Sequence, residues 1–283
     1  MQKNYKKGHI GAAVVLTLVV ASAVILFIIA EKMFSKNSSQ GVIETCRISV
    51  LAQAKLELAG TSPLSLNCLR RYIDIYKDHV ELGNQPDKTK TISIYNKGKK
   101  SNRYKELNED IVNYIVAEEM RICWYQFGEA KTEIFPNNEK LTESIGTADD
   151  DICFICSEIE FIDIKNKQYT GLIEYLKNNY PKDKKYTYWE YFNQPSLSEH
   201  TLEKYIDDCY KDKIDELWNN NRFVFESDKT YAVIFYKDYD DTLSINPIGI
   251  LSPSCSDEGG KSGYHVLVLP TENLEEICEI QAS

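Results

Sequence analysis

Cys153 and Cys156 are the pair in this sequence whose spacing is most familiar from chemistry. In thiol oxidoreductases a Cys-x-x-Cys pair opens a helix, and the positive end of the helix dipole lowers the pKa of the thiol. Here the pair lies in the run 152–164, whose alternating apolar residues predict a β-strand. Side chains three positions apart on a strand point to opposite faces. We therefore expect the two sulfurs to bridge to different partners, and redox catalysis is disfavoured.

Other residue patterns that could support chemistry are weaker. A structural zinc site needs two closely spaced ligand pairs, and the sequence offers one such pair with four scattered histidines. The acidic run 238–241 could bind calcium, but it lacks the glycine and the terminal glutamate of an EF-hand loop. Glu158 and Glu160 could form an acid pair, although two glutamates on an exposed sheet face are ordinary. With no nucleophile elbow and no phosphate-binding glycine loop, the sequence predicts no catalytic residue, metal or cofactor.

The cysteines are even in number and all follow residue 45. In an oxidising compartment such a set indicates disulfides, of which we expect at least two, while the alternative is buried free thiols. Eight cysteines allow 105 connectivities. We expect the helix that contains Cys123 to pack on the face of the strand that carries Cys153, so that these two cysteines form a disulfide. Cys156, on the opposite face, would then pair with Cys46 or Cys68. The alternative is a Cys153–Cys156 bridge at a bend. The candidate disulfide residues are Cys46, Cys68, Cys123, Cys153, Cys156, Cys209, Cys255 and Cys278.

Residues 10–30 form a run of 21 residues without a charge, and a helix of this length spans the hydrocarbon core of a bilayer. Three lysines precede the run, which by the positive-inside bias predicts a cytoplasmic N-terminus at 1–9. A cleaved signal peptide is disfavoured, because the run exceeds the usual length of about 7–15 residues and no small-residue cleavage site follows it. We therefore predict a single-pass cell-membrane protein with a transmembrane helix at 10–30, a juxtamembrane linker at 31–45 and an extracytoplasmic domain at 46–283.

The segment Lys6-Lys7-Gly8 permits a different interpretation of the same N-terminus. It is similar to the processing site of archaeal pilins and archaellins, where cleavage follows the glycine. A chain cleaved after Gly8 would be a pilin-like subunit whose apolar helix packs in a filament core. The sequence from Cys46 onward alternates with period two, which disfavours the long continuous helix of many pilins. Asn37 begins a glycosylation sequon, which is weak support for exposure outside the cell.

The charge of the chain is uneven along its length. The net charge is −10, and residues 1–36 carry five lysines and one glutamate, which leaves −14 for the remainder. Such a surface repels phosphates, so nucleic-acid binding is excluded as the main function. With 43% hydrophobic residues, the part beyond the membrane segment can bury a proper core.

Periodicity predicts a transmembrane helix followed by a mixed α+β domain of mainly antiparallel strands with packed helices. Residues 46–58 alternate and favour a strand, although residues 43, 46, 50, 54 and 58 would also form a helical stripe. The segment 105–127 predicts a helix that ends near Gly128 and turns Glu118 and Glu119 to solvent. Further strands are expected at 68–76, 90–95, 152–164 and 265–269, a hairpin at 222–226 and 230–236, and helices at 170–177 and 196–219.

Two segments carry a family resemblance. Residues 118–131 contain Cys-Trp followed by Phe-Gly-Glu-Ala-Lys, and residues 153–161 begin Cys-Phe-Ile-Cys. This succession, behind a Lys-Lys-Gly anchor, resembles an uncharacterised family of single-pass membrane-anchored proteins from small-genome, DPANN-type archaea. Ala130 stands where that family is expected to have glycine. The resemblance covers most of residues 1–165 and implies a topology and an archaeal source, but no reaction and no catalytic residues.

These observations favour a structural or interaction role at the cell surface over catalysis. The expected partners are the lipid bilayer, through residues 10–30, and other cell-surface proteins, with the oligomeric state left open. The alternatives are the pilin-like subunit and, from the enzyme class, a surface hydrolase or thiol enzyme whose site is assembled from residues distant in the sequence.

Overall fold

The computed structural model describes residues 39–58, 66–85, 88–96, 99–130, 152–182, 184–192, 224–237, 264–274, 278 and 280–282. The chain divides into two compact units, Met1–Thr45 and Cys46–Ser283. The predicted membrane segment 10–30, Gly8, Asn37 and the predicted helix 196–219 lie outside the described residues. Within the described ranges, no helix has the length and apolar character needed to cross a membrane.

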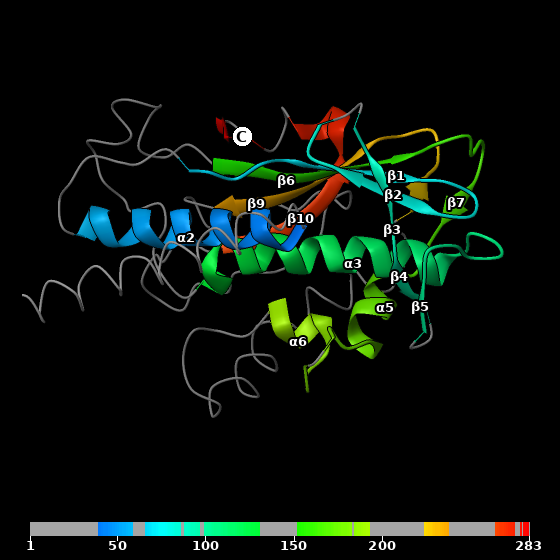
Figure 1. Ribbon diagram of the computed structural model, residues 1–283, viewed down its shortest axis with the longest axis horizontal. Coiled ribbons are helices and arrows are strands. Elements are labelled where there is room, and N and C mark those ends of the chain that lie inside the picture. The colour runs from blue at the N-terminus through cyan, green and yellow to red at the C-terminus, as the bar shows by residue number, and fades with distance from the viewer. Residues whose placement is uncertain are drawn as a thin grey trace, which may run out of the picture. The chain divides into compact units, whose positions relative to one another are not determined.

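The second unit is built on a seven-stranded sheet in which strand β6 is central (Figure 1). Strand β6 pairs antiparallel with β9 along one edge and parallel with both β1 and β11 along the other. The remaining pairs are antiparallel, so the predicted mixed α+β domain with a mainly antiparallel sheet is confirmed. The strands are β1 (Arg71–Ile75), β2 (Val80–Gly83), β3 (Lys90–Ile92), β6 (Ile152–Phe161), β9 (Tyr231–Lys237), β10 (Tyr264–Pro270) and β11 (Ile280–Ala282).

Two short antiparallel pairs lie apart from this sheet: β4 (Ile94–Asn96) with β5 (Lys99–Ser101), and β7 (Gln168–Tyr169) with β8 (Phe225–Glu226). The predicted hairpin of residues 222–226 and 230–236 is wrong. Strand β8 pairs with β7, whereas β9 pairs with β6 and β10.

Helix α3 (Glu109–Gln126) covers one face of the sheet, as predicted, but begins four residues later than expected. Asn108 caps it by accepting a hydrogen bond from the Ile111 N–H, and two acidic residues occupy its first turn, where the helix dipole favours them. The helix ends before Gly128, whose φ of 70° suits a residue without a side chain. Two short helices, α5 (Leu172–Asn178) and α6 (Tyr188–Phe192), pack against α3, with 3₁₀ turns η1 (Gly128–Ala130) and η2 (Thr271–Asn273) elsewhere.

The strand predicted at 46–58 is wrong, because these residues belong to helix α2 (Ser39–Leu58). Cys46, Val50 and Ala54 are almost fully buried, and their spacing of four residues is that of one helix face. Ile48 would share their face on a strand, yet 61% of it is exposed. The helical stripe, which the sequence also contained, is therefore the one that determines the structure.

Strand β6 does not alternate along its whole length. A bulge between Ile155 and Ser157, at their pairing with β9, shifts the register by one residue. Cys153 and Ile155 pack on the side of the sheet away from α3, whereas they were expected on the face that contacts this helix. The α3 side of the strand carries Phe154 and Cys156 before or at the bulge and Ile159 and Phe161 beyond it, so the residues on the two sides of the bulge do not share the faces that strict alternation predicts.

Three disulfides connect the described cysteines: Cys46–Cys68, Cys123–Cys156 and Cys153–Cys278. The predicted pairing of Cys123 with Cys153 is wrong, since α3 lies on the face of β6 that carries Cys156. Cys156 also does not pair with Cys46 or Cys68, which bond to each other. As expected, Cys153 and Cys156 point to opposite faces and bridge to different partners.

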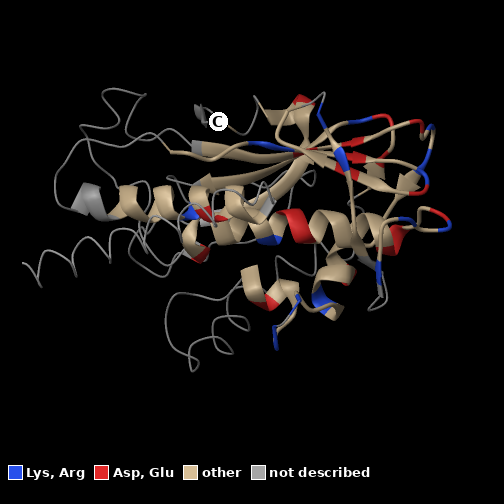
Figure 2. Cartoon of the chain, viewed as in Figure 1, with Lys and Arg blue, Asp and Glu red and all other residues tan. Residues whose placement is uncertain are grey.

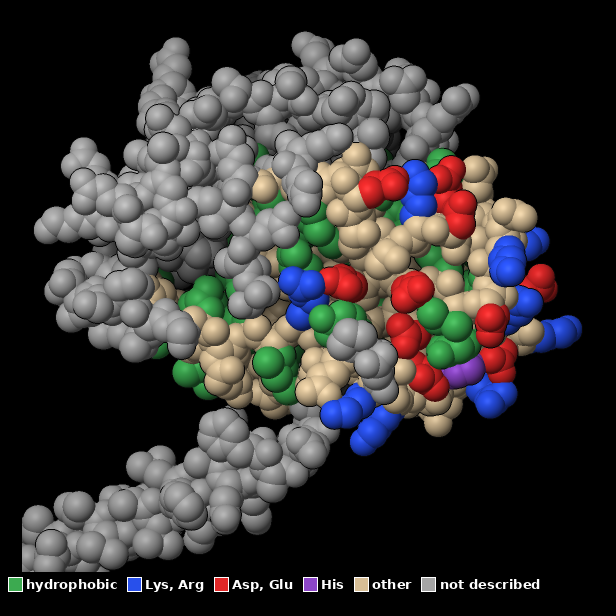
Figure 3. All heavy atoms as spheres, turned by 90° about the horizontal axis from the view of Figure 1, so that it is seen from above, with side chains coloured by type: hydrophobic (Ala, Val, Ile, Leu, Met, Phe, Trp, Pro, Cys, Tyr) green, Lys and Arg blue, Asp and Glu red, His purple; other side chains and the backbone are tan. Residues whose placement is uncertain are grey.

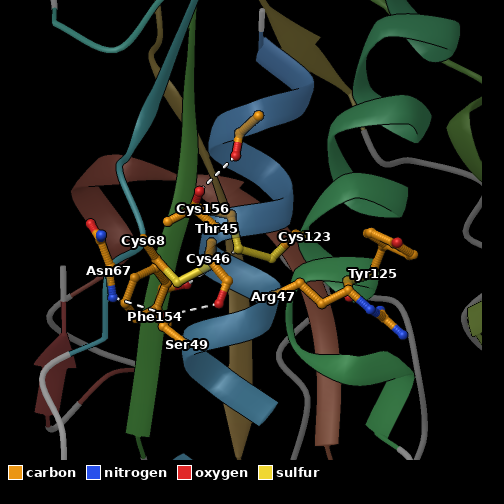
Figure 4. Close-up of a disulfide and its surroundings, with 11 residues drawn as sticks. Thr45, Cys46, Arg47, Ser49, Asn67, Cys68, Cys123, Tyr125, Phe154 and Cys156 are labelled. Atoms are coloured by element: carbon orange, nitrogen blue, oxygen red, sulfur yellow. Dashed lines mark hydrogen bonds between the residues drawn. A yellow bond between two sulfur atoms is a disulfide. The ribbon is translucent and has the colours of Figure 1, made fainter. Parts of the chain in front are cut away.

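Figure 4 shows the first two of these disulfides beside the contacts of α2. Arg47 lies over the Tyr125 ring, with its guanidinium carbon 3.9 Å from the ring centroid, and donates to the Tyr125 carbonyl. The Asn67 N–H donates to the Ser49 hydroxyl at 3.0 Å. The middle of α2 is thus tied both to the end of α3 and to the segment before β1.

Candidate interaction surface

The apolar covering of the sheet is unequal on its two faces. The main core fills the α3 side, and a smaller cluster on the other side packs around β9, β10, Leu274 and Cys278. The smaller cluster does not extend over β1 and β2. Among the described residues, the side chains that point outward from these two strands are mostly polar.

Four carboxylates, Asp74, Glu81, Glu158 and Glu160, define what we term the acidic sheet face (Figure 3). Asp74 on β1 is in register with Glu81 on β2 and with Glu160 on β6. Residues in register on neighbouring strands lie on the same face of a sheet. The β1–β2 hairpin and strand β6, which is distant from it in sequence, therefore bring one row of acidic side chains together.

The environment of Asp74 favours its protonated form. Burial raises the pKa of this carboxyl, a hydrogen bond with Thr89 lowers it, and the charge of Glu81 raises it further, with a net upward shift. Like charges on adjacent strands repel one another. A cationic partner placed over this row would relieve that repulsion.

Neighbouring side chains hold Glu158 and Glu81 in place. Arg70 pairs with Glu158, and both side chains are about one quarter exposed. Glu81 accepts a hydrogen bond from Thr89 at 2.7 Å and lies 3.5 Å from Nε2 of His79. These two carboxylates are therefore held along the sheet surface while they stay partly open to solvent.

The β1–β2 turn closes one end of this face. The ring of Tyr76 stacks on that of His79, with centroids 4.4 Å apart, and the hydroxyl of Tyr104 donates to the backbone carbonyl of His79 at 2.8 Å. A hydrogen bond from His79 lowers the pKa of Asp78, and Arg103 contributes to the same shift. These contacts give the end of the hairpin a defined shape.

Beneath the acidic sheet face, Arg71 and Glu119 form a buried ion pair between β1 and α3. Nε and Nη2 of Arg71 donate to the two carboxylate oxygens of Glu119 at 2.8 and 2.9 Å. Burial lowers the pKa of Arg71, but the charge and hydrogen bonds of Glu119 outweigh it and raise the pKa overall. The prediction that Glu119 faces solvent is wrong, because Arg71 supplies a partner that lets the carboxylate be buried.

A cavity of about 640 Å³ lies at the N-terminal end of α3. Its floor contains Leu107, Ile164 and Tyr169, and three lysines and three acidic residues line it. Because the lining charges balance, this cavity does not favour a ligand of either sign. It gives a weaker basis for a function than the acidic sheet face.

The structure places the predicted site residues in different environments, and some lie outside the described residues. Six of the cysteines are in disulfides, and no cysteine of the described part has a free thiol. Cys209, Cys255 and the acidic run 238–241 lie outside the described residues. In the described ranges, no group of three or more His, Cys, Asp or Glu side chains is placed to hold a metal ion. Because Cys153 and Cys156 are both oxidised in separate bridges, a Cys-x-x-Cys thiol site is not formed.

Sequence reasoning identified Glu158 and Glu160 but missed Asp74 and Glu81. The alternation in Arg71–Ile75 places Asp74 on the polar side of its strand, and that signal was present. What the sequence does not contain is the parallel pairing of β1 with β6, two strands separated by about 80 residues.

Comparison with known proteins adds no relative: no family model, curated protein or solved structure matches this chain.

Proposed function

We propose that this chain is a membrane-anchored extracytoplasmic protein with a structural or interaction role at the cell surface. The observation that carries the proposal is the set of three disulfides, because such bonds persist in oxidising compartments and are rare in the cytosol. The charge-free run 10–30 supplies the anchor, and its lysine-rich N-terminal flank favours an external domain.

The acidic sheet face supports an interaction role. Two of its carboxylates, Glu81 and Glu158, are held in place by Arg70, Thr89 and His79, so a partner would meet a surface that is partly formed in advance. We assign the domain to binding a cationic protein surface.

The proposal is tested on the protein isolated without reduction from the cells that naturally produce it. Alkylation under non-reducing conditions, followed by mass measurement of the intact chain, should label Cys209 and Cys255 at most. Protease added to intact cells should degrade the domain 46–283. Eight labelled thiols, or a domain protected until the cells are lysed, would refute the extracytoplasmic assignment.

The pilin-like subunit processed after Gly8 is a second candidate, and the helix α2 favours it. The alternation from Cys46 argues against a helix in this region, but residues 39–58 are helical. N-terminal sequencing separates the two candidates: a chain that begins at His9 supports the processed subunit, and a chain that begins at Met1 supports the plain anchor.

A further inference from the structure

A second charged surface lies on the layer opposite the acidic sheet face. Helices α5 and α6 pack on α3, which itself packs on the sheet, so they form the third layer of the domain (Figure 1). Lysines occupy α5 and the turn that leads to α6 (Figure 2). We term Lys177, Lys184, Lys185, Tyr186 and Trp189 the lysine–aromatic face.

The ammonium groups of Lys177 and Lys184 lie over aromatic rings. Nζ of Lys177 is 5.6 Å from the Trp189 ring centroid, and Nζ of Lys184 is 5.6 Å from that of Tyr186. The Tyr186 ring in turn stacks on Tyr191, with centroids 5.7 Å apart. Cation–π contacts restrict these flexible side chains, so less conformational entropy is lost when a carboxylate binds them.

Two acidic residues of the described part, Glu174 and Glu190, lie near these lysines and are engaged in local structure. The Glu190 carboxylate accepts a hydrogen bond from the Thr187 N–H at 2.6 Å, and Glu174 accepts one from the Asn178 side chain. Both carboxylates therefore form hydrogen bonds with residues in or directly before their own short helices. Lys177, Lys184 and Lys185 give this surface positive charge on a chain whose net charge is −10.

We propose that the acidic sheet face of one copy of this chain docks on the lysine–aromatic face of a second copy. The argument is charge complementarity: Asp74, Glu158 and Glu160 would meet the three lysines of the neighbouring molecule. Because the two faces lie on opposite layers, the contact is head-to-tail. Such a contact joins copies into a ring or an open chain rather than a two-fold dimer.

This inference rests on the proposed interaction role and names the partner of the acidic sheet face. The other class of occupant, an unrelated cationic protein, would leave the purified chain monomeric. Long-range repulsion between two acidic molecules is screened at roughly 0.1 M salt, where the screening length is about 10 Å, while contacts between the faces persist. At about 1 M salt the length falls to about 3 Å and the contacts weaken.

The test uses the full chain in mild detergent and measures its mass in solution at both salt concentrations. The wild type should be dimeric or larger at the lower concentration and monomeric at the higher one. Glu158→Lys/Glu160→Lys and Lys184→Glu/Lys185→Glu should each raise the dissociation constant at least about tenfold. Mixing the two reversed proteins should restore assembly, because each then presents the charge that the other lacks.

Lys105→Glu/Lys167→Glu is the matched control for the lysine reversal, since it changes the net charge by the same amount at the end of α3 and should leave assembly intact. Circular dichroism and the melting temperature check that each variant folds. A wild type that stays monomeric, an association insensitive to salt and to both reversals, or a mixture that fails to assemble overturns the head-to-tail contact. The thiol-labelling and protease experiments are independent of this result, so they test the proposed extracytoplasmic location separately.

Discussion

Arg71 on β1 and Glu119 on α3 form a bidentate ion pair whose side chains are only 4% and 6% exposed. The pair joins the strand beneath the acidic sheet face to the long helix under the sheet. The third guanidinium nitrogen, Nη1, is buried without a hydrogen-bond partner in the described structure. The charge of each residue therefore depends on the other for compensation.

Replacing one residue of this pair should destabilise the domain more than replacing both residues by apolar ones. Glu119→Gln or Arg71→Met alone leaves a buried polar or charged group without its partner and should lower the free energy of unfolding by about 3–5 kcal/mol. The double variant Arg71→Met/Glu119→Leu should recover most of that loss. Urea unfolding with the disulfides intact measures all three, and additive losses in the double variant would contradict the compensation.

The disulfides should differ in their contribution to stability. Cys153 and Cys278 are 125 residues apart, whereas Cys46 and Cys68 are 22 apart. In the chain-entropy account the longer loop contributes about 5 kcal/mol and the shorter about 3 kcal/mol. Cys153→Ala/Cys278→Ala should therefore unfold at lower urea than Cys46→Ala/Cys68→Ala. Equal midpoints, with equal m-values, would show that loop length does not set the difference.

The elements predicted well are those with a long unambiguous pattern. Helix α3 repeats its apolar stripe over several turns, and strand β6 combines apolar runs with β-branched residues. The segment 46–58 fits both periods, and only its burial against the domain, shown by the exposed Ile48, decides between them. Propensity over one short segment does not contain that information.

The disulfide pairing was missed for a local reason with a large effect. Strict alternation from Ile152 assigns Cys153, Ile155 and Ile159 to one face, but one extra residue at the bulge reverses the assignment beyond it. The acidic sheet face was missed because it depends on register between strands distant in sequence. Neither a bulge nor the register between distant strands can be predicted from the residues of a single strand.

Gly83 is a position where a small side chain should be costly. A Cβ there would lie 2.6 Å from the backbone oxygen of Lys88, closer than atoms of these types approach. Gly83→Ala should therefore force the β2–β3 connection to shift and cost about 1–3 kcal/mol. Amide exchange should speed up in β2 and β3 first. Asn84→Ala, which only shortens an exposed side chain in the same turn, is the control. A Gly83→Ala protein as stable as wild type would show that the turn adjusts freely.

Asp74 should make the domain less stable as the pH rises through its folded pKa. Burial and the charge of Glu81 raise that pKa above the ordinary value of 3.8, against the lowering by Thr89, so the folded protein holds this proton more tightly than the unfolded chain does. The stabilisation is complete below pH 3.8 and is lost above the raised pKa.

Asp74→Asn cannot ionise and should therefore be more stable than wild type at pH 7, with the difference vanishing near pH 3. Urea midpoints across this range measure the effect, with Asp163→Asn as a control for the loss of one acidic charge on an exposed turn. A gain that is the same at every pH would assign the effect to packing of the amide instead. A loss at pH 7 would mean that the carboxylate at position 74 stabilises the row of acidic side chains, contrary to the repulsion inferred from its register with Glu81 and Glu160.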